Sequence, residues 1–505
     1  MKRKPFLSKS KFVAGVQCLK RLYWKVYQPD LAAEIDDQVQ AVMDQGKAVG
    51  VEAQKAFPGG VLAEADYQHT HAALEETARL MANPQVPAVY EAALEHDGIL
   101  VRVDILERQP RNRWRLVEVK SSTQVKGHYR YDVAIQRHVA GGAGLKIASA
   151  CLMHLNREYI YDGKRFDPNR LFVLEDLTAD ADSLAGEVVD LLAAQRRVLQ
   201  EDEPPQVEAG AQCTNPVRCE FFDQCHAPVP AGHVSELPRL TQRKLEALQA
   251  LRIDLIQDIP ESFQLTPAQR RAYECACSGR PWFGPDLRDA LTTLRYPLHF
   301  MDFETFYPAL PRHNGMWPYS HIPFQWSVHV REGPGGELRH HEFLAEDATD
   351  PRLRFLETLL DVLGTTGSIV VYNRSFEAER LKDLAGWFPV HAKQIASIQA
   401  RLWDLLPVVR GNVYHPEFRG SFSIKKTLPA LVPEMTYEGM EVAEGAQAGL
   451  AWETLVHGQL SPNEKTKLRA ALLAYCRQDT EAMVRLCEAL ARAASRQAKT
   501  LGARG

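Results

Sequence analysis

The sequence predicts an α/β protein of two or three domains, and three features of the chain lead to that prediction. The chain has 505 residues, more than the ~250–300 residues that one hydrophobic core usually organises. Apolar runs typical of strands alternate with amphipathic helical patterns, which indicates an α/β layer architecture. Hydrophobic residues make up 45% and charged residues 25% of the chain, which is typical of an ordinary soluble globular protein.

Composition breaks divide the chain. Pro228 and Pro230 end a mixed helix-and-strand region. The following segment, LTQRKLEALQALRIDLIQDIP, has apolar positions at helical spacing. It resembles helix-hairpin-helix DNA binders, but Arg252 stands where the hairpin glycine is expected, which favours a packed linker. We therefore expect an N-terminal domain, a helical linker, a C-terminal domain and a basic tail, at residues 1–230, 231–290, 291–495 and 496–505.

The segment GILVRVDILERQPRNRWRLVEVK predicts two strands joined by a polar turn. Side chains two apart on a strand share a face, so Glu118 and Lys120 point the same way. A hairpin can place Asp104 of the first strand beside Glu118. This pair of carboxylates would hold one or two Mg²⁺ or Mn²⁺ ions, and Lys120 would orient the attacking water or steady a phosphate charge.

This D…ExK pattern resembles the PD-(D/E)xK nucleases, and more specifically their RecB-like branch. The resemblance implies a restriction-endonuclease-type fold with Asp104, Glu118 and Lys120 as catalytic residues. That branch often carries a glutamine on the next helix, and YRYDVAIQRHV supplies Gln136. The chain departs from the branch at Gly50, where a histidine is common; Glu52 is a candidate substitute ligand.

Four of the nine cysteines bracket this region: Cys18, Cys213, Cys219 and Cys225. The arrangement resembles the iron–sulfur RecB-type nucleases, which implies a [4Fe–4S] cluster held by four thiolates as a structural staple. Zinc is the competing occupant, although its sites usually pair cysteines at closer spacing. Four buried thiols without a metal are the third reading.

Three acidic motifs follow in the C-terminal domain. Asp302 and Glu304 share one face of an apolar strand, YPLHFMDFETF. Glu377 follows a second strand and falls in the first turn of a helix. Tyr475 and Asp479 lie one turn apart on the same face of a later helix. Carboxylates from such distant segments suit a pair of hard divalent cations.

The order of these motifs resembles the DnaQ-like exonucleases of the DEDD group, in the variant whose third motif carries tyrosine. The resemblance implies an RNase H-like α/β domain with 3'-5' exonuclease activity. Mg²⁺ or Mn²⁺ would be held by Asp302, Glu304, Glu377 and Asp479, and Tyr475 would position the attacking water. The family usually has aspartate in the second motif, so Glu377 is one methylene longer than expected.

Other residues near these motifs have two readings. Asp404 has a structural role or approaches the substrate. Lys425 and Lys426 contact phosphate or form a solvated helix face. Cys476, in apolar surroundings, is expected in the core. The strand in PYSHIPFQWSVHV is expected to line the core, with base stacking as the alternative.

The whole arrangement resembles a bacterial family of unknown function that joins an iron–sulfur RecB-like nuclease to a DnaQ-like exonuclease. We therefore expect a metal-dependent nuclease that hydrolyses phosphodiester bonds of DNA or RNA at two sites. The alternative is a nucleic-acid-binding or scaffolding protein with one or both sites degenerate. The net charge of −4 offers no general attraction for nucleic acid, so local basic patches would have to supply it. No apolar run reaches the ~18 residues of a membrane span, and we expect a cytoplasmic protein without a membrane partner.

Overall fold

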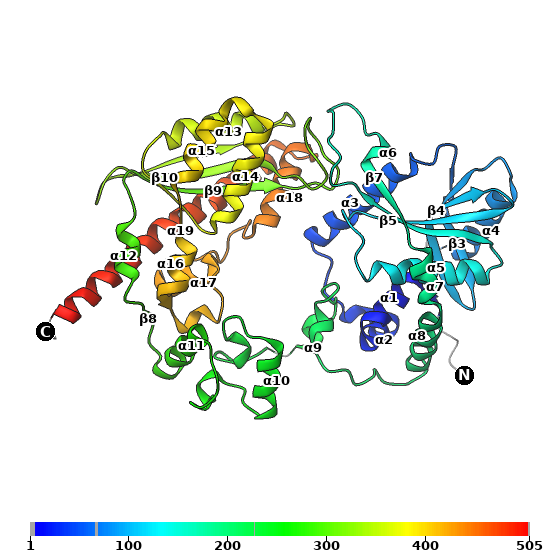
Figure 1. Cartoon of the computed structure of the whole chain (residues 1–505), viewed down its shortest axis with the longest axis horizontal. Coiled ribbons are helices and arrows are strands. Elements are labelled where there is room, and N and C mark those ends of the chain that lie inside the picture. The colour runs from blue at the N-terminus through cyan, green and yellow to red at the C-terminus, as the bar shows by residue number, and fades with distance from the viewer. Residues whose placement is uncertain (1–5, 66–68, 227, 503–505) are drawn as a thin grey trace. The chain divides into compact units, whose positions relative to one another are not determined.

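The computed structural model describes residues 6–65, 69–226 and 228–502 (Figure 1). The chain forms two compact units. The N-terminal unit contains Met1–Pro228 together with Pro308–Ser320, and the C-terminal unit contains Val229–Tyr307 together with His321–Gly505. Both units combine sheets with helices, which confirms the expected α/β class. The expected linker at 231–290 groups with the C-terminal unit. The expected tail continues the last helix to Gly502, and residues 503–505 lie outside the described residues.

The N-terminal unit is built on a mixed sheet with the strand order β2-β3-β4-β5-β6-β7, and β1 pairs with β4. The predicted hairpin is present as β4 and β5, which are antiparallel, while β5 and β6 are parallel. Its turn contains Arg111 and Asn112, both with positive φ. The strands are β1 (Leu7–Ser8), β2 (Val61–Leu62), β3 (Ala88–His96), β4 (Ile99–Gln109), β5 (Arg113–Lys120), β6 (Ile147–Leu155) and β7 (Phe172–Asp176).

Helices cover both faces of this sheet. Leu116 packs in a core with residues of α1, α5 and α8, whereas Val117 packs with residues of α3. Alternation along β5 therefore turns Glu118 toward the α5 face. The helices of this unit are α1 (Lys9–Gln17), α2 (Leu19–Tyr27), α3 (Asp37–Gln54), α4 (Thr70–Ala82), α5 (Tyr129–Gly142), α6 (Pro168–Leu171), α7 (Thr178–Ser183), α8 (Ala185–Val198) and α9 (Phe222–Cys225).

The C-terminal unit contains a five-stranded sheet with the order β11-β10-β9-β12-β13. Strands β9, β10 and β11 are antiparallel, and β12 and β13 run parallel to β9. Residues of α13, α14 and α15 pack on one face in a single core cluster, and α18 and α19 lie against the other face (Figure 1). The strands are β9 (Leu298–Phe306), β10 (Ile322–Arg331), β11 (Leu338–Leu344), β12 (Ser368–Val371) and β13 (Leu402–Asp404).

Strand β10 is almost entirely buried, so its aromatic residues Phe324 and Trp326 line the core as expected. Tyr319 precedes this strand, is half-buried and groups with the N-terminal unit. Met301 and Phe303 of β9 pack under α13 to α15, so the alternate residues Asp302 and Glu304 face α18 and α19. The helices of the sheet domain are α12 (Leu287–Thr292), α13 (Arg352–Leu363), α14 (Arg374–Trp387), α15 (Ala392–Arg401), α16 (Leu405–Asn412), α17 (Ile424–Leu431), α18 (Gly445–His457) and α19 (Pro462–Gly502).

The expected linker contains α10 (Gln242–Ala250) and α11 (Pro267–Ser278), and a small sheet pairs β8 (Trp282–Phe283) with β14 (Val413–Tyr414). Arg252, just after α10, has a φ of 55°. It therefore adopts the left-handed conformation that a hairpin glycine would supply. Across the described residues, no helix combines the length and the apolarity that a membrane crossing needs.

Candidate functional sites

Strand β9 brings the first acidic pair together. A carboxylate oxygen of Asp302, a carboxylate oxygen of Glu304 and the Sγ of Cys476 all lie within 4.8 Å of one another. Cys476 was expected as a core residue, and it is fully buried. Its Sγ donates to the carbonyl oxygen of Asp302 at 3.9 Å, and burial followed by the neighbouring acids raises the thiol pKa well above its usual range. The protonated thiol therefore packs behind the two carboxylates.

Helix α19 supplies Tyr475 and Asp479, both buried. Tyr437, which the sequence did not single out, donates its hydroxyl to Asp479 Oδ1 at 2.5 Å. Tyr475 also hydrogen-bonds to Asp479. Burial raises the pKa of Asp479 to about 6, although these hydrogen bonds and Lys425 oppose the shift. Two tyrosine hydroxyls therefore orient this carboxylate.

Polar contacts hold α19 against β10 on either side of Asp479. Thr480 Oγ1 lies 2.8 Å from both Ser327 Oγ and His329 Nδ1. Gln325 Nε2 donates to the Leu472 carbonyl oxygen at 2.7 Å. Because these contacts are buried and directional, they set the register of the helix against the sheet.

Glu377 lies in the first turn of α14 and is 2% exposed. Asp404 accepts hydrogen bonds from the backbone N–H groups of Asn373 and Arg374, each at 3.0 Å, and caps α16 through Leu406. Asn373 has a φ of 88°, so Asp404 holds the sharp turn that presents Glu377. This favours the structural reading of Asp404.

The four acids form one electrostatic cluster. Burial first, and then Asp479 and Glu377, raise the pKa of Asp302, while burial and then Asp302 and Asp479 raise that of Glu304. Burial raises the pKa of Glu377 to about 8, and its Oε2 has no hydrogen-bond partner in the described part of the chain. No ion pair joins any of these acids to a described lysine or arginine.

Lys425 offsets part of the negative charge of Asp302, Glu304 and Asp479. Its ammonium donates to the Ala443 carbonyl oxygen and lies 5.8 Å and 5.5 Å from the ring centres of Tyr437 and Tyr475. Lys426 is exposed on the same helix. Of the two lysines, only Lys425 is therefore placed beside the acids.

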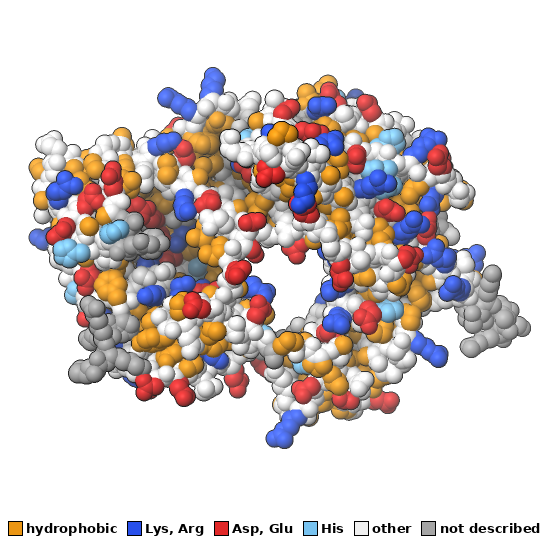
Figure 2. All heavy atoms as spheres, turned by 180° about the vertical axis from the view of Figure 1, so that it is seen from behind, with side chains coloured by type: hydrophobic (Ala, Val, Ile, Leu, Met, Phe, Trp, Pro, Cys, Tyr) orange, Lys and Arg blue, Asp and Glu red, His pale blue; other side chains and the backbone are white. Residues whose placement is uncertain are grey.

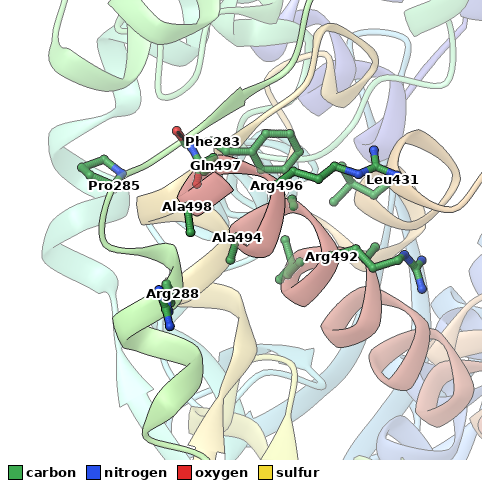
Figure 3. A pocket seen from close by; sticks show the side chains of 12 residues that line it. Phe283, Pro285, Arg288, Leu431, Arg492, Ala494, Arg496, Gln497 and Ala498 are labelled. Atoms are coloured by element: carbon green, nitrogen blue, oxygen red, sulfur yellow. Dashed lines mark hydrogen bonds between the residues drawn. The ribbon is translucent and has the colours of Figure 1, made fainter. Parts of the chain in front are cut away.

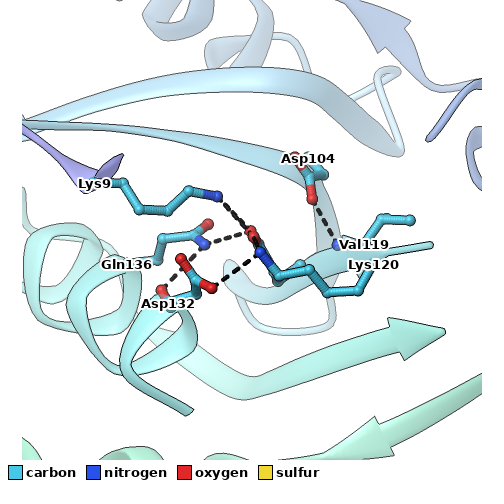
Figure 4. Close-up of polar contacts among 7 residues, drawn as sticks. Lys9, Asp104, Val119, Lys120, Asp132 and Gln136 are labelled. Carbon is cyan, nitrogen blue, oxygen red and sulfur yellow. Dashed lines mark hydrogen bonds and ion pairs between the residues drawn. The ribbon is translucent and has the colours of Figure 1, made fainter. Parts of the chain in front are cut away.

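In the N-terminal unit, Glu118 is the centre of a second polar cluster, and Figure 4 labels its partners Lys9, Lys120 and Gln136. Glu118 is 1% exposed, and its Oε1 lies 2.8 Å from Lys120 Nζ. Gln136 Nε2 donates to Oε2 at 2.5 Å. Asp104 Oδ2 accepts from the backbone N–H of Val119 at 2.6 Å. The structure thus brings together Asp104, Glu118, Lys120 and Gln136, the four residues expected in this site.

Three further residues belong to this cluster. Lys9 Nζ lies 2.7 Å and 2.8 Å from the two carboxylate oxygens of Glu118. Asp132 Oδ2 lies 2.9 Å from Lys120 Nζ. Glu91, with a φ of 54°, interrupts the pairing of β3 with β4 near Asp104. Asp132 is four residues before Gln136 on α5, a helical spacing that sequence reasoning could have used.

The two carboxylates of this site have opposite pKa shifts. Burial, followed by the neighbouring Glu118, raises the pKa of Asp104 to about 8. Burial acts in the same direction on Glu118, but Lys9 and Lys120 overcome it and hold its pKa well below the usual range. Glu52, the candidate substitute ligand, forms an ion pair with Lys55 at 2.6 Å.

The four bracketing cysteines converge in the N-terminal unit. Burial raises the pKa of Cys225, and the thiols of Cys213 and Cys18 add to that shift. The backbone N–H of Cys219 donates to the Cys213 carbonyl oxygen at 2.8 Å, and Cys18 contributes to the raised pKa of Cys219. Among the described residues, no three of these sulfurs lie within 4.8 Å of one another.

Other contacts hold the same segments together. Glu220 accepts from Arg21 at 2.7 Å and from Lys25 at 2.8 Å. The rings of Trp24 and Phe221 lie 5.5 Å apart. The segment that contains Cys219 is therefore held against α2 by ion pairs and by aromatic packing as well.

A groove of about 1020 Å³ lies along the C-terminal part of α19 (Figure 3). Phe283, Leu431 and Ala494 supply apolar lining, and the arginines are Arg288, Arg492 and Arg496. No aspartate or glutamate is among the described residues that line it. The groove thus combines an apolar floor with positive charge.

Comparisons with known proteins identify related sequences but no activity. Residues 299–423 match a family described as a domain of unknown function, DUF2779. The chain is 22% identical over 218 residues to the uncharacterized protein UU173 of Ureaplasma parvum serovar 3, covering 39% of this chain and 31% of that protein. It is 24% identical over 219 residues to the uncharacterized protein MG366 of Mycoplasma genitalium, covering 40% and 33%.

The matched region spans about a third of each of these two relatives. A solved structure titled "Crystal structure of SSO0001" aligns with 15% identity and a TM-score of 0.23, covering 41% of this chain and 81% of that one. The family match includes Asp302, Glu304 and Glu377, but it ends before Tyr475 and Asp479.

Proposed function

We propose that this protein is a metal-dependent nuclease that hydrolyses phosphodiester bonds of DNA or RNA, with an exonuclease site in the C-terminal unit and a second site in the N-terminal unit. The observation that carries the proposal is the gathering of Asp302, Glu304, Glu377 and Asp479. Three of these acids are buried and Asp302 is half-buried. Neighbouring acids of the group raise the pKa of Asp302 and of Glu304, and none of the four pairs with a described arginine or lysine. Such a concentration of negative charge is costly unless a cation neutralises it.

The donor set fits Mg²⁺ or Mn²⁺, because hard divalent ions prefer carboxylate oxygens and Glu377 Oε2 has no hydrogen-bond partner among the described residues. Bound ions would supply Lewis-acid activation of water and charge neutralisation at the phosphate. The chain's own residues do the positioning. Tyr437 and Tyr475 orient Asp479, Tyr475 directs the attacking water, and Lys425 steadies an anionic phosphate oxygen.

We assign the C-terminal unit to the RNase H-like (DnaQ) class. Three placements support the assignment. The first motif is on β9, the central strand of a mixed sheet, the second opens the helix after the parallel strand β12, and the third is on the long helix packed against β9.

We assign the N-terminal unit to the RecB-like PD-(D/E)xK class. Asp104 and Glu118 on adjacent strands are the metal ligands of this proposal, Lys120 is the catalytic lysine and Gln136 orients Glu118. A raised pKa on one acid and a lowered pKa on its neighbour is a pattern common at functional sites.

Cys18, Cys213, Cys219 and Cys225 would hold a [4Fe–4S] cluster. Sulfurs bound to one zinc ion lie ~3.8 Å apart, since each Zn–S bond is ~2.3 Å and the geometry is tetrahedral. No three described sulfurs of this group lie within 4.8 Å of one another. Four thiolates, one for each iron, are the ligand set that a [4Fe–4S] cluster requires.

The groove on α19 offers nucleic acid a contact beyond the acids. Arg492 follows Asp479 by thirteen residues on the same helix, which is ~20 Å at 1.5 Å per residue. Arginines bind phosphates, and an apolar floor with Phe283 accepts a base face. We propose that the strand entering the C-terminal site passes over this groove.

Cleavage assays test the proposal with the full chain, end-labelled single- and double-stranded DNA and RNA, and Mn²⁺ or chelator. The pair Asp302→Asn and Glu304→Gln should abolish one activity, and the pair Glu118→Gln and Lys120→Met should abolish the other. Glu379→Gln, on the exposed side of α14, and Glu158→Gln, exposed in the N-terminal unit, are matched controls that keep both.

If the wild type with metal cleaves none of these substrates, the enzymatic proposal is wrong. Binding without cleavage would support the alternative of a nucleic-acid-binding or scaffolding protein with degenerate sites. Glu377 in place of the usual aspartate and Gly50 in place of the common histidine are the features that favour this alternative.

A further inference from the structure

Helix α1 carries Lys9 into the N-terminal acid cluster, and no motif assigns this lysine a role. Its ammonium contacts both oxygens of Glu118, at 2.7 Å and 2.8 Å. Immobilising a lysine costs side-chain entropy, and removing its charge from water costs solvation. Such a pair is favourable only where a buried acid needs a cation.

The charge balance of the cluster shows why Glu118 needs one. Four acids lie in or beside it, and Lys120 divides its ammonium between two of them, Glu118 at 2.8 Å and Asp132 at 2.9 Å. The Lys9 ammonium lies within 2.8 Å of both Glu118 oxygens. A divalent ion on Glu118 would use the same oxygens. Lys9 and the ion therefore compete for them.

The rest of α1 holds Lys9 in place. The helix begins at Lys9 and ends at Gln17, so Cys18 follows its last residue. Gln17 Nε2 donates to the carbonyl oxygens of Gln212 and Val217, at 2.6 Å and 2.8 Å. These acceptors flank Cys213 in sequence. The far end of the helix is thus fixed to the cysteine-bearing segment, about 13 Å of helix from Lys9.

We propose that Lys9 is the resident cation of the N-terminal site. It orients Glu118 when the site holds no metal, yields those oxygens to a divalent ion, and then contacts an anionic phosphate oxygen of the substrate. The inference rests on the proposed nuclease function of this site. It adds a residue that lies 109 positions from Glu118 in the chain.

The test uses the full chain with Asp302→Asn and Glu304→Gln, so that only the N-terminal site turns over. Lys9→Ala and Lys9→Arg are compared with Lys11→Ala, a control on the same helix whose ammonium donates to the Phe6 carbonyl oxygen. Mn²⁺ affinity is measured by calorimetry in the absence of substrate. Turnover is measured separately at saturating Mn²⁺.

Lys9→Ala should bind Mn²⁺ about tenfold more tightly, because a competing charge has gone, and should turn over about 10²-fold more slowly, because a phosphate contact has gone. Lys9→Arg should keep the parental affinity and recover part of the rate. The proposal would be overturned if Lys9→Ala bound Mn²⁺ more weakly and melted at a lower temperature than the parent. It would also be overturned if Lys9→Ala had the same Mn²⁺ affinity as the parent.

If the parent and Lys9→Ala turn over equally, the phosphate contact is excluded and the proposal fails. If the parent has no N-terminal activity, the proposed nuclease function of this site fails. The calorimetric comparison still decides whether Lys9 competes with a cation for Glu118, because it requires no turnover. The two failures are therefore distinguishable.

Discussion

Replacing Glu377 by glutamine should flatten the pH dependence of stability in the metal-free C-terminal unit. Burial raises the pKa of Glu377 from 4.5 to about 8, so the folded protein retains a proton that the unfolded chain releases. The stability associated with this proton is fully present below the unfolded pKa and is lost as pH rises toward 8. Glutamine removes the titration while preserving the side-chain volume.

The size of the effect follows from the shift. A pH of 7 is about 2.5 units above the unfolded pKa of Glu377. Keeping the proton in the folded protein at this pH lowers the free energy of unfolding by about 3 kcal/mol, at 1.36 kcal/mol per unit. At pH 5 the cost is about 1 kcal/mol by the same relation. Between pH 5 and pH 7, the free energy of unfolding should therefore fall by about 2 kcal/mol more in the wild type than in the variant. Water does not screen this effect, because Glu377 is 2% exposed.

Urea unfolding of the full chain in chelator measures this difference. Tryptophan fluorescence mainly reports the C-terminal unit, which contains five of the eight tryptophans: Trp282, Trp326, Trp387, Trp403 and Trp452. Glu379→Gln, an exposed change on the same helix, should keep the wild-type slope. Equal pH slopes for the wild type and Glu377→Gln would refute the reasoning. Saturating Mn²⁺ should stabilise the wild type more than Glu377→Gln.

Three further outcomes are expected. Tyr475→Phe should lower exonuclease turnover by about 10²-fold and leave calorimetric Mn²⁺ affinity unchanged; loss of metal binding would instead make Tyr475 a structural residue. Anaerobically purified protein should contain iron and show a broad visible absorbance band that Cys225→Ser removes, whereas a colourless protein with stoichiometric zinc would contradict the cluster. The triple variant Arg288→Ala, Arg492→Ala and Arg496→Ala should bind single-stranded nucleic acid more weakly, and the slope of log affinity against log salt concentration should fall by about 2. Anisotropy in the Asp302→Asn and Glu304→Gln background measures both quantities. An unchanged slope would exclude the groove from the path of the nucleic-acid strand.

Local patterns were sufficient for several parts of the structure. The β4–β5 hairpin followed from strand periodicity around a polar turn, because strand faces alternate every residue. Asp302 and Glu304 share a face for the same reason, and Tyr475 and Asp479 share one by helical spacing. The position of Glu377 in the first turn of α14 followed from the end of the preceding strand.

Periodicity carries no information about contacts between distant segments. Lys9 reaches Glu118 across 109 residues, and Tyr437 reaches Asp479 across 42. The grouping of Pro308–Ser320 with the N-terminal unit, although it connects two strands of the other sheet, is of the same kind. Such contacts depend on how whole elements pack, and sequence spacing does not encode them.

The amino-acid pattern alone therefore established the α/β class, the strand and helix faces and the acids that point from them. Folding determined which of those faces meet, and with that the buried charge at each cluster: a raised pKa for Glu377 and a lowered one for Glu118. The physical reason is that desolvation and Coulomb interactions depend on distance in space, and chain separation does not set that distance.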